Sequence, residues 1–284
     1  LPGVDAKQPV YAILRCFPGY NFKDAGVYEI SPDDQGTAWN LRELFPLPFA
    51  HRLSLLEKAG GLYLVAASLA QTKEGPEDWS RPGSVYAIPF VDGRPQPDAA
   101  RPVLEGIHRN HGMLVATFGG VPYLFISGSE GLFATPLSES GETSSWEQWL
   151  QEEVSEVGIR DLDGDGIEEL VTIAPFHGNS LTVYRMQGES RTGGKWRPVA
   201  RVGLAFGHGL WCGEILGGPG ILVSNRSGSG DLELYRLLKG GLSKEVLDYS
   251  VGAANVEVIT RSDQTLVFST NQANGEVALY TLWI

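Results

Sequence analysis

The sequence predicts an all-β fold, because it combines many turn residues with a short strand-like motif that occurs six times. The 284 residues include 36 glycines and 17 prolines, which favour tight turns between strands. Each copy of the motif mixes apolar and polar residues around an aromatic, as a half-buried strand does. The copies lie at residues 26–30, 84–88, 131–135, 181–185, 232–236 and 277–281.

The spacing of the copies predicts the architecture. They lie roughly fifty residues apart, and a unit of four antiparallel strands can be laid out around each one. In the clearest unit the strands are expected at 208–215, 220–225, 232–237 and 244–249. Such a repeat predicts a β-propeller of about six four-stranded blades in one domain, residues 1–284, although five or seven blades would also fit. The first unit lacks its first strand, and the last unit lacks its fourth.

Charge and composition exclude several classes of function. The formal net charge of −12 disfavours nucleic-acid binding, because an acidic surface repels phosphate backbones. No apolar run is long enough to span a bilayer, and no basic amphipathic stretch suggests a membrane surface. With no visible signal peptide, we expect a cytoplasmic protein. Cys16 and Cys212 lie in apolar runs far apart and are expected to be free thiols.

Three of the five histidines begin the predicted first strand of a unit. In a propeller the first strand of each blade is innermost, so these side chains should meet at the mouth of the central channel. Imidazoles with a carboxylate suit Zn, Mn, Fe or Ni, and open coordination positions would make the site catalytic. Alternatively, the histidines plug the channel and bond to backbone groups. The expected ligands are His51, His111, His208, Glu153 and Asn255.

The loops after each second strand should share that mouth. Trp79 and amide side chains in these loops could hold the ring and hydroxyl groups of a sugar. His177 is the candidate base, and Arg226 could stabilise an oxyanion. Each could also be an ordinary loop residue. The expected substrate contacts are Lys73, Trp79, Asn179 and Asn271.

An acidic loop is the most specific local motif. Three carboxylates at alternate positions, a glycine for the turn and a glutamate at the ninth position predict a calcium loop. It should lie at the face opposite the histidines and bind a structural ion; the alternative is an Asp-Gly turn without an ion. The expected ligands are Asp161, Asp163, Asp165 and Glu169.

At these residues the chain resembles the FG-GAP, or VCBS-type, propeller repeat, although only the unit around 154–186 matches that pattern well. Propellers with a repeat of this type occur in sugar-processing enzymes, including the aldos-2-ulose dehydratase type, and in adhesion proteins. The resemblance implies a metal-dependent lyase, dehydratase or isomerase acting on a small sugar or keto-sugar. The alternative is a non-catalytic propeller that binds a glycan or a protein. Fold analogy alone does not decide between them.

Overall fold

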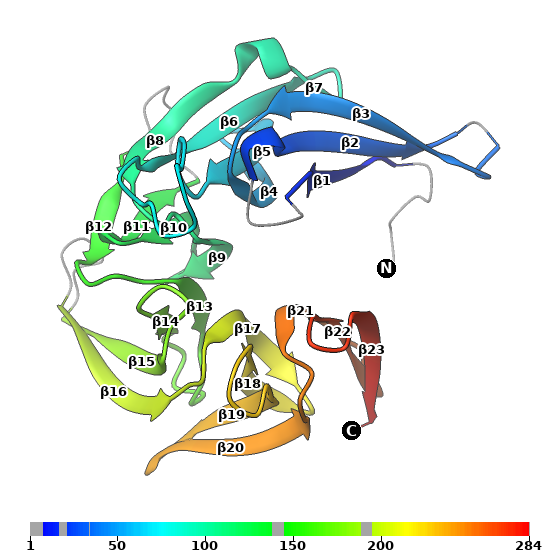
Figure 1. Ribbon diagram of the computed structural model, residues 1–284. Coiled ribbons are helices and arrows are strands. Elements are labelled where there is room, and N and C mark those ends of the chain that lie inside the picture. Colours follow the sequence, from blue (N-terminus) through cyan, green and yellow to red (C-terminus); the bar gives the residue numbers. More distant parts are fainter. Residues whose placement is uncertain (1–7, 17–21, 34, 138–144, 189–194, 284) are drawn as a thin grey trace. The chain divides into compact units, whose positions relative to one another are not determined.

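The computed structural model describes residues 8–16, 22–33, 35–137, 145–188 and 195–283 (Figure 1). The described chain is almost entirely β-structure, with two short 3-10 helices, η1 (Phe22–Asp24) and η2 (Pro97–Ala99). Neither of these helices is long and apolar enough to cross a membrane. The predicted all-β fold class is therefore confirmed.

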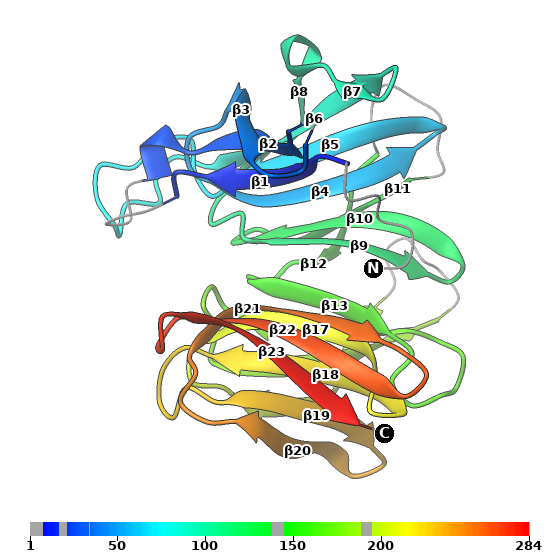
Figure 2. The same ribbon diagram turned by 90° about the vertical axis from the view of Figure 1, so that its right-hand side faces the viewer.

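The strands form six antiparallel sheets, each built from strands that are close in sequence (Figures 1 and 2). The first contains β1 (Val10–Leu14), β2 (Gly26–Pro32) and β3 (Trp39–Pro46). The second contains β4 (Ala50–Lys58), β5 (Gly61–Ser68), β6 (Gly83–Val91), β8 (Arg101–Ile107) and the short β7 (Arg94–Pro95). The third contains β9 (Gly112–Phe118), β10 (Val121–Gly128), β11 (Gly131–Pro136) and β12 (Glu147–Leu150).

The fourth sheet contains β13 (Glu156–Arg160), β14 (Glu169–Ala174), β15 (Ser180–Gln187) and β16 (Lys195–Gly203). The fifth contains β17 (Gly207–Ile215), β18 (Gly218–Asn225), β19 (Leu232–Leu238) and β20 (Gly241–Asp248). The sixth contains β21 (Ala253–Thr260), β22 (Gln264–Asn271) and β23 (Glu276–Trp283). This is the β-propeller fold with six blade sheets, as predicted. The first and last sheets have three strands each, and the fifth has the four predicted strands within a few residues.

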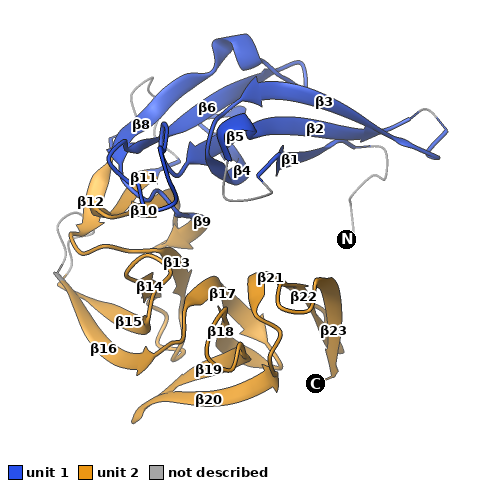
Figure 3. Cartoon of the chain, viewed as in Figure 1, with its two compact units in different colours: residues 1–115, 136–145 blue, residues 116–135, 146–284 orange. Residues whose placement is uncertain are grey.

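The contacts within the chain group it into two compact units (Figure 3). Unit 1 comprises residues 1–115 and 136–145, and unit 2 comprises residues 116–135 and 146–284. The division falls inside the third sheet. Cys16 of unit 1 and Cys212 of unit 2 are free, as predicted, and burial raises the pKa of both thiols.

Each unit has its own apolar core. In unit 1, Leu64 and Ala66 of β5 pack with Val27 and Ile88. In unit 2, Val171 and Ile173 belong to one core cluster, and others centre on the fifth and sixth sheets. The second strands of the second, fourth and fifth sheets are largely buried on both faces, so their sequences are mostly apolar runs rather than alternating ones.

Candidate functional site

In unit 1, one end of the second sheet gathers several predicted site residues. Ala50 at the start of β4 pairs with Ser68 at the end of β5, and Gly83 at the start of β6 pairs with Ile107 at the end of β8. His51, the β5–β6 loop (residues 69–82) and residues 108–111 therefore lie at the same end of this sheet. The sequence placed these segments together, and within unit 1 the structure confirms it.

The two predicted metal-binding histidines of unit 1 lie side by side. The ring centroids of His51 and His111 are 4.3 Å apart. His51 is the extra residue of a β-bulge between Ala50 and Arg52. The guanidinium of Arg52 donates from Nε to the carbonyl oxygen of His111 at 2.8 Å, which ties β4 to the segment before β9.

In unit 2, His208 occupies the corresponding bulge of β17, between Gly207 and Gly209. Its Nδ1 lies 2.7 Å from the carbonyl oxygen of Ala254. Because a carbonyl only accepts, Nδ1 donates this hydrogen bond, and in the neutral ring the lone pair is then on Nε2, as in histidines that bind metals or act as bases. A Cβ on Gly209 would lie 2.6 Å from Ser224 Oγ, so a larger residue beside the bulge would displace this hydroxyl, which accepts a hydrogen bond from the Gly209 amide.

The predicted base lies next to His208 in unit 2. His177 follows β14, with φ of 51°, and its ring stacks on those of Phe176 at 3.8 Å and Phe206 at 4.7 Å. The rings of His177 and His208 are 5.1 Å apart. The guanidinium of Arg226 lies 5.3 Å from the centre of the Phe206 ring. Unit 2 therefore brings two imidazoles and a guanidinium together around aromatic rings.

One predicted ligand, Glu153, does not lie at the position that the sequence predicted. Counting along the sequence put Glu153 at the position of His208, but the strand register is different. Glu156 pairs with Ile173 as Gly209 pairs with Ser224, so Ser155 is the equivalent residue. The predicted position of Glu153 is therefore wrong. Glu153 lies in the loop before β13, where its carboxylate accepts a hydrogen bond from Ser129 Oγ at 3.1 Å.

Asn255 lies where the sequence placed it, in the bulge of β21 between Ala253 and Val256. Its side-chain oxygen accepts a hydrogen bond from the amide of Val256. His51 and His111 belong to unit 1, whereas His208 and Asn255 belong to unit 2. The shared metal site thus stays a prediction.

Of the predicted substrate contacts, Lys73 and Trp79 lie together in the β5–β6 loop. The ammonium of Lys73 lies 3.3 Å from the centre of the Trp79 ring. Asn179 is exposed in the β14–β15 loop. Asn271 is fully buried, and its amide is bonded to Ser269, Glu276 and the hydroxyl of Tyr280. Its position therefore does not favour contact with a ligand.

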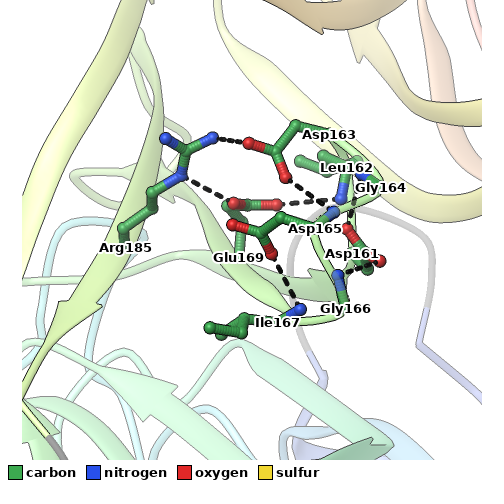
Figure 4. Close-up of polar contacts among 9 residues, drawn as sticks. All are labelled: Asp161, Leu162, Asp163, Gly164, Asp165, Gly166, Ile167, Glu169 and Arg185. Carbon is green, nitrogen blue, oxygen red and sulfur yellow. Dashed lines mark hydrogen bonds and ion pairs between the residues drawn. The ribbon is translucent and has the colours of Figure 1, made fainter.

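The acidic loop lies between β13 and β14, at the opposite end of the fourth sheet from His177, as predicted (Figure 4). Oxygens of Asp161, Asp163 and Glu169 all lie within 4.8 Å of one another, an arrangement that could hold a cation. Asp165 instead accepts a hydrogen bond from the amide of Ile167 at 2.8 Å.

A guanidinium already contacts two of these carboxylates. Arg185 donates from Nε to Glu169 at 2.8 Å, and its terminal nitrogen pairs with Asp163 (Figure 4). Glu169 is buried, and burial raises the pKa of its carboxyl even though Arg185 opposes the shift. The hydrogen bond to Glu169 in turn raises the pKa of Arg185.

Sequence reasoning missed Arg185, although a signal was present. The repeated motif ends in Tyr-Arg in two units, at Arg185 and Arg236. Arg236 also contacts the turn between the first two strands of its sheet, donating to the carbonyl oxygens of Pro219 and Ile215 at 2.8 Å. The motif therefore carries an arginine that fastens this turn. Arg109, which lies 5.6 Å from the Trp79 ring centre, was also missed.

Comparison with known proteins supports the fold alone. No protein-family model matches the chain, and neither does any curated protein. Among solved structures, a proposed 6-phosphogluconolactonase from Bacteroides uniformis has a TM-score of 0.54 and 11% identity over 96% of this chain and 82% of that protein. Trypanosoma rangeli sialidase in complex with 2,3-difluoro-KDN has a TM-score of 0.53 and 13% identity over 96% of this chain. The chain spans about half of the sialidase, 51% of its length.

Proposed function

We propose that this chain is a carbohydrate-active β-propeller, a metal-dependent lyase, dehydratase or isomerase that acts on a sugar or keto-sugar. The observation that carries the proposal is the cluster of His177, His208 and Arg226, in which a hydrogen bond fixes the tautomer of His208. Two proteins of similar fold bear the names of sugar-processing enzymes, a lactonase and a sialidase, which supports a carbohydrate as the substrate class. The resemblance to FG-GAP propellers and to the aldos-2-ulose dehydratase type belongs to the same proposal.

In the proposed reaction His177 removes the proton on the carbon next to a carbonyl, and the C–H electron pair forms an enolate. Arg226 stabilises the enolate oxygen. For a dehydratase, the enolate re-forms the carbonyl and the neighbouring C–O bond breaks. The leaving hydroxide takes the proton back from His177 and departs as water. For an isomerase, the enolate oxygen takes the proton of the neighbouring hydroxyl, whose oxygen becomes the new carbonyl, and His177 returns its proton to the former carbonyl carbon.

The proposed metal ligands are His51, His111 and His208, with Glu153 and Asn255 as further candidates. The tautomer of His208 fits a metal ligand, because the lone pair lies on Nε2. A bound Zn, Mn, Fe or Ni ion would polarise the substrate carbonyl. Asn179 and the Lys73–Trp79 pair are the proposed sugar contacts, whereas Asn271 is left out because its amide is used inside its sheet.

Elemental analysis of the purified chain tests this function, followed by assays for water loss and isomerisation with keto-sugars. We expect one transition-metal ion per chain, and we expect His208→Ala to lose both metal and turnover. His108→Ala is the matched control, since His108 is not a proposed ligand. A chain without stoichiometric transition metal would favour the alternative, a non-catalytic propeller that binds a glycan or a protein.

We also propose that calcium binds the acidic loop as a structural ion. Asp161, Asp163 and Glu169 supply hard oxygen ligands. Because Arg185 contacts two of these carboxylates, an ion must compete with the guanidinium. Isothermal titration with calcium tests this, and Asp161→Asn should weaken binding. Heat signals that are equal with and without the three carboxylates would contradict it.

A further inference from the structure

Two cations from different segments of unit 1 lie against one indole ring. Lys73 comes from the β5–β6 loop, and Arg109 comes from the segment between β8 and β9. The ammonium of Lys73 lies 3.3 Å, and the guanidinium carbon of Arg109 5.6 Å, from the centre of the Trp79 ring. Cation–π attraction stabilises each contact, but it also holds two positive charges near each other.

The loop keeps this positive charge although the chain is acidic overall, with 34 Asp and Glu against 22 Lys and Arg. Burial lowers the pKa of Lys73, and the charge of Arg109 acts in the same direction, while Glu77 and Asp78 oppose them. Asp78 uses its carboxylate inside the loop, accepting from the amides of Glu74 and Ser80 at 2.9 and 3.0 Å. In the described part of the chain, no ion pair joins Lys73 to a carboxylate.

A buried amide adjoins this pair in sequence. Asn110, next to Arg109, is fully buried, and neither its side-chain nitrogen nor its oxygen has a hydrogen-bond partner among the described residues. Buried polar groups in folded proteins are nearly always paired, so an amide in this state points to a partner other than the described residues, such as a bound water or ligand. An amide both donates and accepts, which suits a hydroxyl-bearing ligand.

We propose that Lys73 and Arg109 bind the anionic group of the substrate, with Asn110 bonded to that group or to an adjacent hydroxyl. The substrate class is then a sugar acid or a sugar phosphate rather than a neutral sugar. An oxyanion is attracted by both cations, and a guanidinium can hold it through two hydrogen bonds. This inference rests on the proposed function, in which Lys73 is a proposed sugar contact, and it names the substrate class.

The β5–β6 loop is built to keep Lys73 in place. The ammonium donates to the carbonyl oxygen of Pro76 at 2.5 Å, which fixes it over the ring. Asp78 also accepts from the hydroxyl of Ser80 at 2.7 Å. The loop backbone is thus held by Asp78, while the cations are positioned by Trp79. A preformed arrangement of this kind lowers the entropy cost of binding an anion.

Equilibrium binding to the full chain tests the proposal with glucuronate, inorganic phosphate and glucose as probes, in calorimetry at low salt. We expect glucuronate or phosphate to bind and glucose to bind at least tenfold more weakly. Whichever anion binds more tightly distinguishes a carboxylate from a phosphate. Lys73→Gln and Arg109→Gln should each lose about tenfold in affinity, equivalent to about 1.4 kcal/mol.

Arg101→Gln is the matched control, because Arg101 is an exposed cation of the same sheet outside this cluster. It should bind as the unaltered chain does. Lys73→Arg keeps the charge and should retain binding, so that a folding defect in Lys73→Gln is recognised. Failure of both anions to bind, or equal losses in Lys73→Gln and Arg101→Gln, would overturn the proposal.

Failure of the proposed function would look different. Anion affinity that depends on Lys73 and Arg109, in a chain without transition metal or turnover, would support this inference and reject the enzyme. Stoichiometric metal and turnover of a neutral sugar, without anion binding, would support the proposed enzyme and reject this inference.

Discussion

The acidic loop of unit 2 and the β5–β6 loop of unit 1 handle charge in opposite ways. In the acidic loop, Asp161 accepts from two backbone amides, and Arg185 contacts Asp163 and Glu169 (Figure 4). In the β5–β6 loop, Lys73 and Arg109 share one indole. The first loop uses its carboxylates to bind its own backbone and Arg185, whereas the second holds a cation of the loop and a cation of another segment against one ring.

This difference teaches that a sharp sequence motif need not mark the place where a ligand acts. The acidic pattern is the most specific motif in the chain, yet its carboxylates are used to fold the loop. The cationic pair has no motif, because its members lie far apart in sequence. Two cations that contact one ring attract an oxyanion, which makes the second loop the better candidate for recognition.

The largest expected effect is on the acidic loop. Arg185→Gln removes the cation from the buried Glu169, and it should lower the free energy of unfolding by about 2 kcal/mol. This is less than for a fully buried pair, because the Arg185 side chain is 42% exposed. The melting temperature should fall by about 6 °C.

The matched control for that change is Arg160→Gln, since Arg160 forms an exposed ion pair with Glu214 in the same unit. Exposed pairs contribute less than about 1 kcal/mol. Thermal unfolding of both variants measures the difference. Equal melting temperatures would show that the guanidinium of Arg185 does not hold the loop.

A smaller effect is expected from Asp78→Asn, and it should depend on pH. Hydrogen bonds from Glu74 and Ser80 hold the pKa of Asp78 at about 2, below its ordinary value. A lowered folded-state pKa adds stability above the unfolded value near 3.9 that is lost as the pH falls toward 2. The wild-type chain should therefore be more stable than Asp78→Asn at neutral pH, and melting curves should converge on acidification. The Glu169 carboxyl affects stability in the opposite direction. Because burial raises its pKa, it favours the folded state less as the pH rises.

The smallest effect is expected for Lys73→Gln without an anion. The variant loses a cation–π contact but also the repulsion between Lys73 and Arg109, so the free energy of unfolding should change by less than about 0.5 kcal/mol. Sodium chloride screens the attraction of Lys73 to Glu77 and Asp78, which exceeds its repulsion from Arg109, so added salt should narrow the difference in stability between the wild-type chain and the variant. Denaturant titrations at low and high salt measure this. A loss comparable to that of Arg185→Gln would mean that the cation mainly stabilises the fold.

Much of the fold could be predicted from the sequence, because strand alternation and a repeated aromatic motif are local signals. The strands of the fifth sheet were located within a few residues, and the incomplete first and last sheets were expected. Within each unit, the end of the sheet at which His51, His177 and His208 lie also followed from strand order. The sequence could not show that the contacts group the chain into two units.

The details of the site depended on information that is not local. Glu153 was misplaced because the loop before β13 shifts the count, and only the pairing of Glu156 with Ile173 reveals Ser155 as the equivalent residue. The contact of Arg109 with Trp79 joins segments about thirty residues apart, which no periodicity encodes. The burial of Asn271 likewise depends on how its sheet packs.

The bulges that hold His51 and His208 also affect how such a chain can change over evolutionary time. A bulged residue is extra to the two-residue alternation of its strand, so its identity is uncoupled from the apolar side chains that fill the core. The chain already carries histidine at two such positions and Asn255 in a third bulge. A substitution at one of these positions should change the side chain at the end of the sheet without changing the packing of the core. These positions are therefore suited to engineering new specificity.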